Sequence, residues 1–182
     1  DKGERTDMSK YRPIAVASIM YRILSKAMVL AINPLLNTLT SHHQRAFKPG
    51  TQIDENIRLV QDVIAYCEAE QQPGMLVFAD QDNAYPRIRW EFLHKVMATM
   101  NLHADFRAVV RTMYNDPKLR FKANGTLSPQ SAKPTNGLAQ GCPLSPYLFV
   151  AWMTVMMHDA EERFYELWPS HRPPRAHRPL QD

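Results

Sequence analysis

A run of five apolar residues, MLVFA at positions 75–79, constrains the fold of this chain more than any other feature. Such a short, unbroken run predicts a strand buried on both faces, which other segments have to cover. Segments in which apolar residues recur three and four positions apart predict helices around it: 14–36, 54–70, 90–100, 104–115 and 143–164. Asn124-Gly125 predicts a hairpin turn between 119–124 and 130–134. Helices interleaved with a few strands indicate an α+β fold, or a mixed α/β one.

The composition is that of a folded protein of ordinary size. Of the 182 residues, 45% are apolar and 22% charged, which excludes a disordered or collagen-like chain. The unbroken apolar runs fall far short of the roughly 20 residues that span a bilayer, so no membrane segment is expected. Cys67 and Cys142, the two cysteines, argue against a disulfide framework and favour a reducing compartment. A formal net charge of +4 permits a nucleic-acid partner without requiring one.

Two segments carry residues suited to a binding site. Asp80 directly follows the apolar run, where a strand delivers its side chains to a cleft, and carboxylates in clefts bind divalent metals. The plainer interpretation is that Asp80 and Asp82 open a polar turn. In segment 137–146, Gly141 permits a close backbone approach and Gln140 can hydrogen-bond a base. The alternative there is a structural loop that caps the next helix.

Four blocks in order along the chain carry a resemblance to a known family. They are 9–14 (SKYRPI), 44–50 with 56–59 (QRAFKPG and NIRL), 78–85 (FADQDNAY) and 140–146 (QGCPLSP). With these blocks the chain resembles the reverse transcriptases of non-LTR (LINE-type) retrotransposons and, more distantly, those of group II introns. The resemblance extends from about residue 2 to residue 166, and its most specific part is the last block.

The resemblance implies a right-hand polymerase fold. It assigns the fingers to about 1–74, a portion of the palm to about 75–168, and a Pro- and Arg-rich tail to 169–182. It also implies that the Asp-Asp hairpin and the thumb are lacking, because the acidic residues after position 146 fall on a predicted helix.

For the chemistry, the resemblance implies transfer of a deoxynucleotide from dNTP to the 3′-hydroxyl of a DNA primer on an RNA template, with two Mg²⁺ ions. Asp80 would bridge both ions, and the backbone carbonyl of Gln81 would complete one site. One carboxylate compensates the charge of two divalent ions poorly. The expectation is therefore a fragment of an RNA-directed DNA polymerase that does not polymerise alone.

The resemblance places five residues around the incoming nucleotide: Arg12, Gln81, Tyr85, Gln140 and Gly141. Arg12 would contact the triphosphate, because a guanidinium fork matches phosphate oxygens, and Lys2 would assist it. Tyr85 would lie under the sugar as a steric gate against a 2′-hydroxyl. Gln140 and Gly141 would shape the pocket. For each residue taken alone, an exposed charge, a loop residue or a core aromatic is the plainer interpretation.

The sequence also departs from the family pattern at four positions. Gln81 replaces an apolar residue and Pro86 replaces an aspartate, while Thr51 and Ala139 stand where arginines are common. Pro86 is expected to push Tyr85 towards extended geometry, because the residue before a proline disfavours the helical region.

Two further functions stay open from the sequence: a non-catalytic RNA-binding module of the same fold, and a maturase role that would need a thumb-like extension. The expected partners are an RNA template, a DNA primer and dNTP, with no membrane and no obligate protein partner. The expected location is intracellular, with the nucleus favoured by the family. Some further residues are interpreted as exposed or core-filling. The exposed ones are His42, His43, His171, His177, Arg172, Arg175 and Arg178, and the core-filling ones are Met153, Met156 and Met157.

Overall fold

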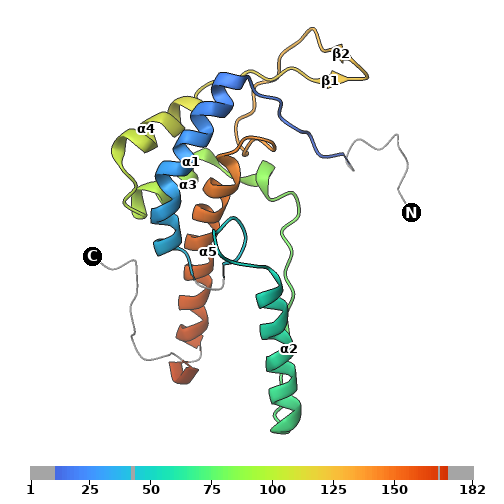
Figure 1. Cartoon of the computed structure of the whole chain (residues 1–182), viewed down its shortest axis with the longest axis vertical. Coiled ribbons are helices and arrows are strands. Elements are labelled where there is room, and N and C mark those ends of the chain that lie inside the picture. Colours follow the sequence, from blue (N-terminus) through green and yellow to red (C-terminus); the bar gives the residue numbers. More distant parts are fainter. Residues whose placement is uncertain (1–10, 42–43, 168, 172–182) are drawn as a thin grey trace.

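The computed structural model describes residues 11–41, 44–167 and 169–171 (Figure 1). The expected histidine pair at 42–43 and the arginines of the tail lie outside these residues, as does the side chain of His171. The elements are α1 (Ile19–Leu39), α2 (Asp54–Ala69), η2 (Tyr85–Arg87), α3 (Trp90–Thr99), α4 (Ala104–Met113), β1 (Lys122–Ala123), β2 (Thr126–Leu127), α5 (Ser145–Leu167) and η3 (Pro169–His171). Helices with one small sheet agree with the predicted α+β class.

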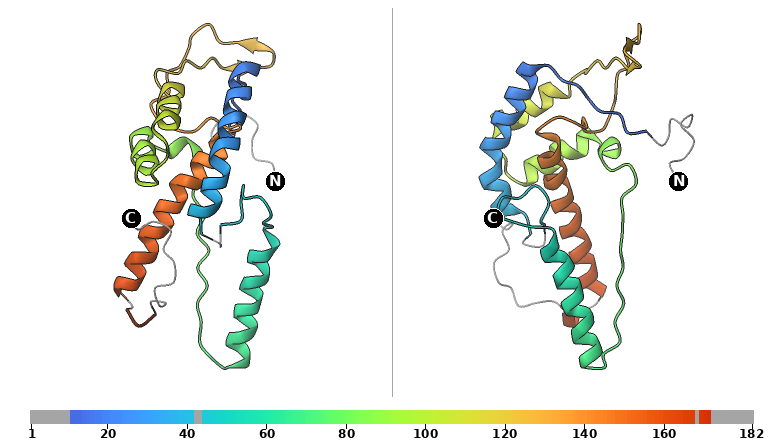
Figure 2. Two further views of the ribbon diagram at one scale, coloured as in Figure 1. Left: turned by 60° about the vertical axis from the view of Figure 1, so that its left-hand side comes forward. Right: turned by 45° about the vertical axis from the view of Figure 1, so that its right-hand side comes forward.

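Helix α5 is the centre of the packing. It packs against α1 and α3, and α3 packs in turn against α4 (Figure 2). The buried apolar side chains come mainly from these four helices: Met28, Val29, Ile32 and Leu36; Leu93, Val96 and Met97; Val110; Leu148, Val150 and Ala151. These residues recur three and four positions apart, as on one face of a helix. In α1 this is a different face from the one predicted, because Ile19, Ile23 and Leu24, which predicted the helix, are exposed.

Helix α1 begins and ends later than the predicted 14–36. Ser18 caps its start, where the Ser18 hydroxyl accepts a hydrogen bond from the backbone N–H of Tyr21 at 3.3 Å. A proline inside a helix favours a bend or an end, yet Pro34 lies within α1 and the helix continues to Leu39. The helix ends at Thr40, whose hydroxyl donates to the carbonyl of Leu36 at 2.7 Å.

The expectation that no segment is apolar enough to cross a membrane was wrong for α1. Among the described residues, α1 is the one helix that is long and apolar enough to cross a membrane, judged by length and composition only. Its mean hydropathy is 1.4 over 18 residues. No unbroken apolar run marks α1, because Arg22 and Lys26 interrupt its apolar residues. Met28, Val29 and Ile32 are buried, but only 28% of this window is buried, and Met20 and Leu30 are exposed.

The predicted buried strand at 75–79 is wrong for this structure. Residues 73–81 have no regular secondary structure, and Met75 and Phe78 are 86% and 83% exposed. An apolar strand is buried only where neighbouring strands pair with its backbone and other elements cover its faces. In the part of the chain that the structure describes, the only sheet is the β1–β2 hairpin, so 75–79 has no such neighbours.

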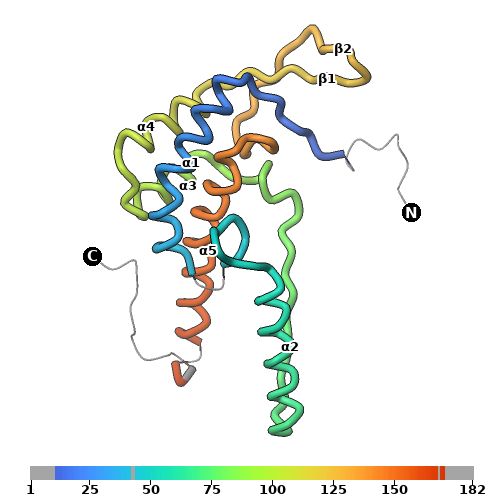
Figure 3. Tube along the Cα trace, viewed as in Figure 1, coloured from blue at the N-terminus to red at the C-terminus, as the bar shows by residue number. Residues whose placement is uncertain are grey.

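Helix α2 forms as predicted but contributes no buried residue. It extends away from the other helices, and the chain returns from its far end as one extended stretch (Figure 3). An open groove of about 640 Å³ lies between the end of α2 and this stretch, and Ile64, Cys67 and Met75 are among its lining residues. The apolar face that predicted α2 is therefore largely exposed.

The predicted hairpin is confirmed with a different second strand. Asn124 and Gly125 have φ of 49° and 82°, the positive values that a two-residue type I′ turn requires. They join β1 to β2, and Lys122 pairs with Leu127. The predicted partner segment 130–134 contributes only the bridge between Leu119 and Ala132.

The methionines of α5 were expected to fill the core. Met153 is half-buried, but Met156 and Met157 are exposed. The helical spacing of these methionines does not show how far the neighbouring helices extend. Helices α1 and α3 cover only the first part of the long helix α5 (Figure 2).

The exposed run at 75–79 predicts self-association of the 182-residue chain. An extended apolar segment with unpaired backbone groups is a template for pairing with a second copy. We expect sedimentation velocity to show concentration-dependent oligomers, and the double variant V77K/F78K to shift the protein towards monomer. As a control, M20K/L30K adds the same charge at exposed apolar positions of α1, where helix bonds use the backbone groups, and should leave association unchanged. A native chain that stays monomeric at all concentrations would contradict this prediction.

Candidate functional site

The loop 137–141 is hydrogen-bonded to the segment around η2. The backbone N–H of Gly137 donates to the carbonyl of Ile88 at 2.7 Å, and that of Leu138 donates to the carbonyl of Tyr85 at 2.9 Å. The indole Nε1–H of Trp90 donates to the carbonyl of Gly137 at 2.7 Å. Three hydrogen bonds between segments nearly 50 residues apart therefore fix the loop against the start of α3.

Two glycines of this loop lie where a side chain would not fit. Gly137 has φ of 92°, and a Cβ there would lie 3.1 Å from the Cα of Pro86. Gly141 has φ of 107°, and a Cβ there would lie 2.7 Å from the carbonyl oxygen of Ala15. The backbone N–H of Ala15 donates to the carbonyl of Gln140 at 2.6 Å. Gly141 thus allows the extended segment before α1 to lie directly on the loop, as the close backbone approach expected of it requires.

The packing of three segments at this loop forms a small pocket of about 220 Å³. It is lined by Arg12, Tyr85, Ala139, Gln140, Gly141, Ser145 and Pro146. Four of the five residues expected around an incoming nucleotide therefore meet, although they come from three regions of the sequence. The volume is below the roughly 300–1,000 Å³ of pockets that enclose a whole ligand, so it suits part of one.

Tyr85 forms one wall of the pocket in a geometry different from the predicted one. Tyr85 is the first residue of η2, a 3₁₀ helix of one turn, and is therefore not extended. Its carbonyl accepts hydrogen bonds from the N–H groups of Ile88 and Leu138. Its ring stacks on that of Phe149, with centroids 5.1 Å apart and planes 19° apart. Burial raises the pKa of Tyr85, so the hydroxyl stays neutral at physiological pH. The stacked ring is held rigidly in the pocket wall.

Beneath the loop lies a group of buried polar side chains that the sequence analysis missed. The sulfur of Cys142 lies 3.5 Å from the hydroxyl of Ser25 and 3.8 Å from that of Tyr21, and its single S–H can donate to either one. Burial raises the pKa of Tyr21 well above its usual value and that of Tyr114 to about 12. Ser25 and Tyr21 lie outside the set of apolar residues that predicted α1, so no local signal marked them. Cys142 contributes packing and a weak hydrogen bond.

Asp80 and Gln81 do not lie among the residues that line the pocket. Both are exposed, in the extended stretch that leads to η2. Asp82 forms an ion pair with Arg87 at 3.0 Å. Among the described residues there is no group of three or more His, Cys, Asp or Glu side chains that could hold a metal ion. Asp80 with one carbonyl does not fit two divalent ions, since one carboxylate leaves most of their charge uncompensated.

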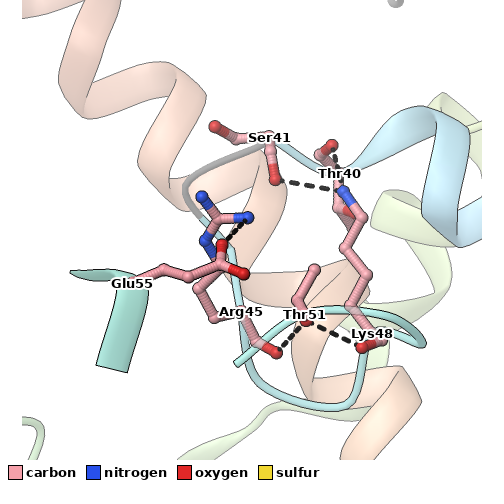
Figure 4. A network of polar contacts seen from close by, with 6 residues as sticks. All are labelled: Thr40, Ser41, Arg45, Lys48, Thr51 and Glu55. Atoms are coloured by element: carbon pink, nitrogen blue, oxygen red, sulfur yellow. Dashed lines mark hydrogen bonds and ion pairs between the residues drawn. The ribbon is translucent and has the colours of Figure 1, made fainter. Parts of the chain in front are cut away.

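The block at 44–50 serves a structural role between α1 and α2 (Figure 4). The ammonium of Lys48 donates to the carbonyls of Thr40 and Ser41, at 3.3 Å each. Arg45 forms an ion pair with Glu55 at 2.7 Å. The hydroxyl of Thr51 lies 2.7 Å from the carbonyl oxygens of both Arg45 and Lys48. Thr51, one of the departures from the family pattern, thus helps to close this loop.

Comparisons with known proteins show the family of this chain. The family model described as "Reverse transcriptase (RNA-dependent DNA polymerase)" matches residues 1–172, and the chain belongs to that family. The chain is 26% identical over 148 residues to the "Transposon TX1 uncharacterized 149 kDa protein" of Xenopus laevis, a match that covers 81% of this chain and 11% of that protein.

A second relative is the "Retrovirus-related Pol polyprotein from type-1 retrotransposable element R2" of Nasonia vitripennis. The two are 23% identical over 156 residues, or 86% of this chain and 15% of the relative. The R2DM element polyprotein of Drosophila melanogaster is 24% identical over 139 residues, or 76% and 13%. The predicted resemblance to non-LTR retrotransposon reverse transcriptases is thereby confirmed, and the chain spans 11–15% of the length of these relatives.

The fit of Gly141 under Ala15 predicts a large loss of stability on Gly141→Ala. Left-handed strain costs about 1–2 kcal/mol, and overpacking against the Ala15 carbonyl adds about 1–3 kcal/mol. Gly50→Ala is the matched control, because Gly50 also has a positive φ (75°) but a Cβ added there would meet nothing within 4 Å. Denaturant unfolding should show a clearly larger loss of unfolding free energy for Gly141→Ala. Equal losses for the two variants would mean that segment 11–18 does not pack on the loop.

The different burial of the two cysteines predicts selective labelling. Cys67 is partly exposed and Cys142 is buried. A thiol reagent such as dithionitrobenzoate should therefore modify one thiol rapidly in the native chain and both in denaturant. The Cys67→Ser variant should lose the fast reaction, whereas Cys142→Ser should keep it. Fast labelling of native Cys67→Ser would show that the core beneath the loop is open.

Proposed function

We propose that this chain forms the incoming-nucleotide pocket of an RNA-directed DNA polymerase of a non-LTR retrotransposon. The observation that carries the proposal is that Arg12, Tyr85, Gln140 and Gly141 line one pocket. These residues belong to three separate blocks of the family pattern. An arginine suits the phosphates of a nucleotide, and an aromatic ring suits its sugar. A glycine leaves the backbone open to the base, beside the amide of Gln140.

Each residue has a role that follows from its chemistry. Arg12 binds phosphate oxygens through its guanidinium, and the start of α5 at Ser145 adds the positive end of a helix to the same pocket. Tyr85, fixed by its stacking on Phe149, supports the sugar and crowds a 2′-hydroxyl. Gln140 offers its side-chain amide to a base.

Divalent metal ions supply charge stabilisation in reverse transcriptases as a family. In this chain Asp80 and Gln81 are the residues proposed to contribute to metal binding, and alone they are too few. We therefore propose that the 182 residues bind a deoxynucleotide but do not extend a primer. Magnesium-dependent primer extension by the purified chain on an RNA template, abolished by Asp80→Asn, would refute this part.

The pocket assignment predicts selective effects on nucleotide binding. In equilibrium dialysis with labelled dTTP, Arg12→Gln should weaken binding about tenfold or more, because a charge-assisted phosphate contact is lost. Arg22→Gln removes a cation of the same kind on the exposed surface of α1 and should change binding less than twofold. Tyr85→Ala should narrow the preference for dTTP over UTP. The assignment fails if Arg12→Gln and Arg22→Gln weaken dTTP binding equally.

A non-catalytic role in binding RNA is the second candidate. It is favoured by the exposed position of Asp80, outside the pocket and without further metal ligands among the described residues. Retention of RNA binding without any binding of dTTP would favour this candidate.

A further inference from the structure

Helix α1 presents a continuous apolar face to solvent. Its large exposed apolar side chains recur three, four and seven positions apart, and each is between 39% and 75% exposed: Ile19, Met20, Ile23, Leu24, Leu30 and Leu35. The exposed Ala27 and Ala31 lie between them. At 1.5 Å per residue, the face from Ile19 to Leu35 is about 24 Å long. An exposed apolar surface of this extent marks a site for another protein or for a membrane.

The other half of α1 belongs to the hydrophobic core. Val29, Ile32 and Leu36 are almost fully buried, and α1 packs on α5 at the outside of the helical group (Figure 2). Ile23 and Ile32 are nine residues, or about two and a half turns, apart, which places them on opposite sides of the helix. To cross a bilayer, α1 would have to leave this core. The helix is therefore placed to lie on a membrane while the domain stays folded.

Two cations lie along one edge of the apolar face. Residues 8–53 contain six Lys and Arg residues and no Asp or Glu. Arg22 and Lys26, one turn apart on α1, are exposed and form no ion pair with a residue that the structure describes. Lys26 lies one turn before Leu30, so its stem runs beside the apolar face. A long cationic side chain covers apolar surface with its methylene groups and carries its charge to the polar edge.

The start of α1 adds to this positive charge. The free backbone N–H groups at a helix N-terminus carry about half a positive charge, which carboxylates in the first turn usually offset. The first turn of α1 has no acidic residue and includes Arg22 instead. This placement does not stabilise the isolated helix, and it favours an anionic partner.

The composition of the face favours lipid over protein as the partner. From Ile19 to Leu35 the exposed apolar side chains are all aliphatic or methionine, whereas the side chains that dominate protein interfaces are Trp, Tyr and Arg. The surface of a helix is convex, so a protein partner would need a matching groove, whereas acyl chains adapt to its shape. By length and composition, α1 is apolar enough even to cross a membrane. An apolar helix face edged by Lys and Arg is typical of helices that lie in a membrane surface.

We propose that α1 docks on the surface of an anionic phospholipid membrane, with its apolar face among the acyl chains and with Arg22 and Lys26 on the headgroup phosphates. The sequence predicted no membrane partner, because no unbroken apolar run marks this helix. The residues that line the nucleotide pocket include none from α1, so membrane binding and nucleotide binding are tested independently.

The test measures flotation of the 182-residue chain with vesicles of phosphatidylcholine that contain about one third phosphatidylserine, over a range of lipid concentrations. M20K/L30K places two charges in the apolar face and should weaken binding about tenfold or more. Because this variant adds positive charge, attraction by charge alone would strengthen its binding instead. The control V77K/F78K adds the same charge at another exposed apolar site and should not weaken binding.

A second pair of variants tests the headgroup contacts. R22Q/K26Q should weaken binding to the anionic vesicles about tenfold and leave binding to pure phosphatidylcholine vesicles unchanged, since cations gain only at an anionic surface. The control R58Q/K95Q removes the same charge from α2 and α3, where both cations form ion pairs within their own helix, and its effect should be small.

Insertion of the face is measured with an environment-sensitive dye. The dye on Ile23→Cys, in a Cys67→Ser background, should shift its emission to the blue when anionic vesicles are added. The same dye on Gln61→Cys, at an exposed position of α2, should show no shift. Circular dichroism of each variant shows whether the helices remain.

Three results would overturn the proposal: equal losses in M20K/L30K and V77K/F78K, tighter binding by M20K/L30K, or an unshifted dye at position 23. Failure of the native chain to bind the anionic vesicles would overturn it as well, and would leave a protein as the partner of this face. Each of these results leaves the proposed nucleotide pocket standing.

Discussion

The hydrogen bonds of loop 137–141 are the contacts on which the arrangement of this chain depends. Gly137 and Leu138 bond to the 85–88 turn, Trp90 bonds to Gly137, and Ala15 bonds to Gln140. These bonds bring the segment before α1, the turn η2 and the start of α5 to one place. The pocket exists because all three segments converge there, and because glycine allows the backbones to approach within a distance that any Cβ would obstruct.

Asp80 lies outside the region where these segments converge. The pocket residues are fixed by hydrogen bonds and by the stacking of Tyr85 on Phe149, whereas Asp80 lies in an exposed extended stretch without neighbouring strands among the described residues. Catalysis requires reacting groups to be held at defined positions. The pocket and the predicted metal-binding residue are therefore physically separate in this structure: the pocket depends on a packed loop, whereas Asp80 lies in an exposed segment.

Much of the fold could be predicted because its signals are local. The spacing of apolar residues predicted α2, α3, α4 and α5, and Asn124-Gly125 predicted the hairpin turn, since only such residues accept positive φ readily. The buried strand at 75–79 and the methionine packing of α5 were wrong for the same physical reason. An apolar pattern indicates a side chain that gains from burial, but burial needs a second surface, and the pattern does not say whether one is there.

The sequence by itself determined the elements, the family blocks and the residue types of the pocket, because helix periodicity, turn chemistry and short motifs depend on neighbours along the chain. The tertiary structure decided that Arg12, Tyr85 and Gln140 share a pocket, that Asp80 lies outside it, and that Cys142 contacts Tyr21 across 121 positions. It also placed the β1–β2 hairpin on a projection from the helices (Figure 1). Such contacts form because packed helices and close backbone approaches bring together segments that are far apart in the sequence. A pattern of neighbouring residues does not show which distant segments will meet.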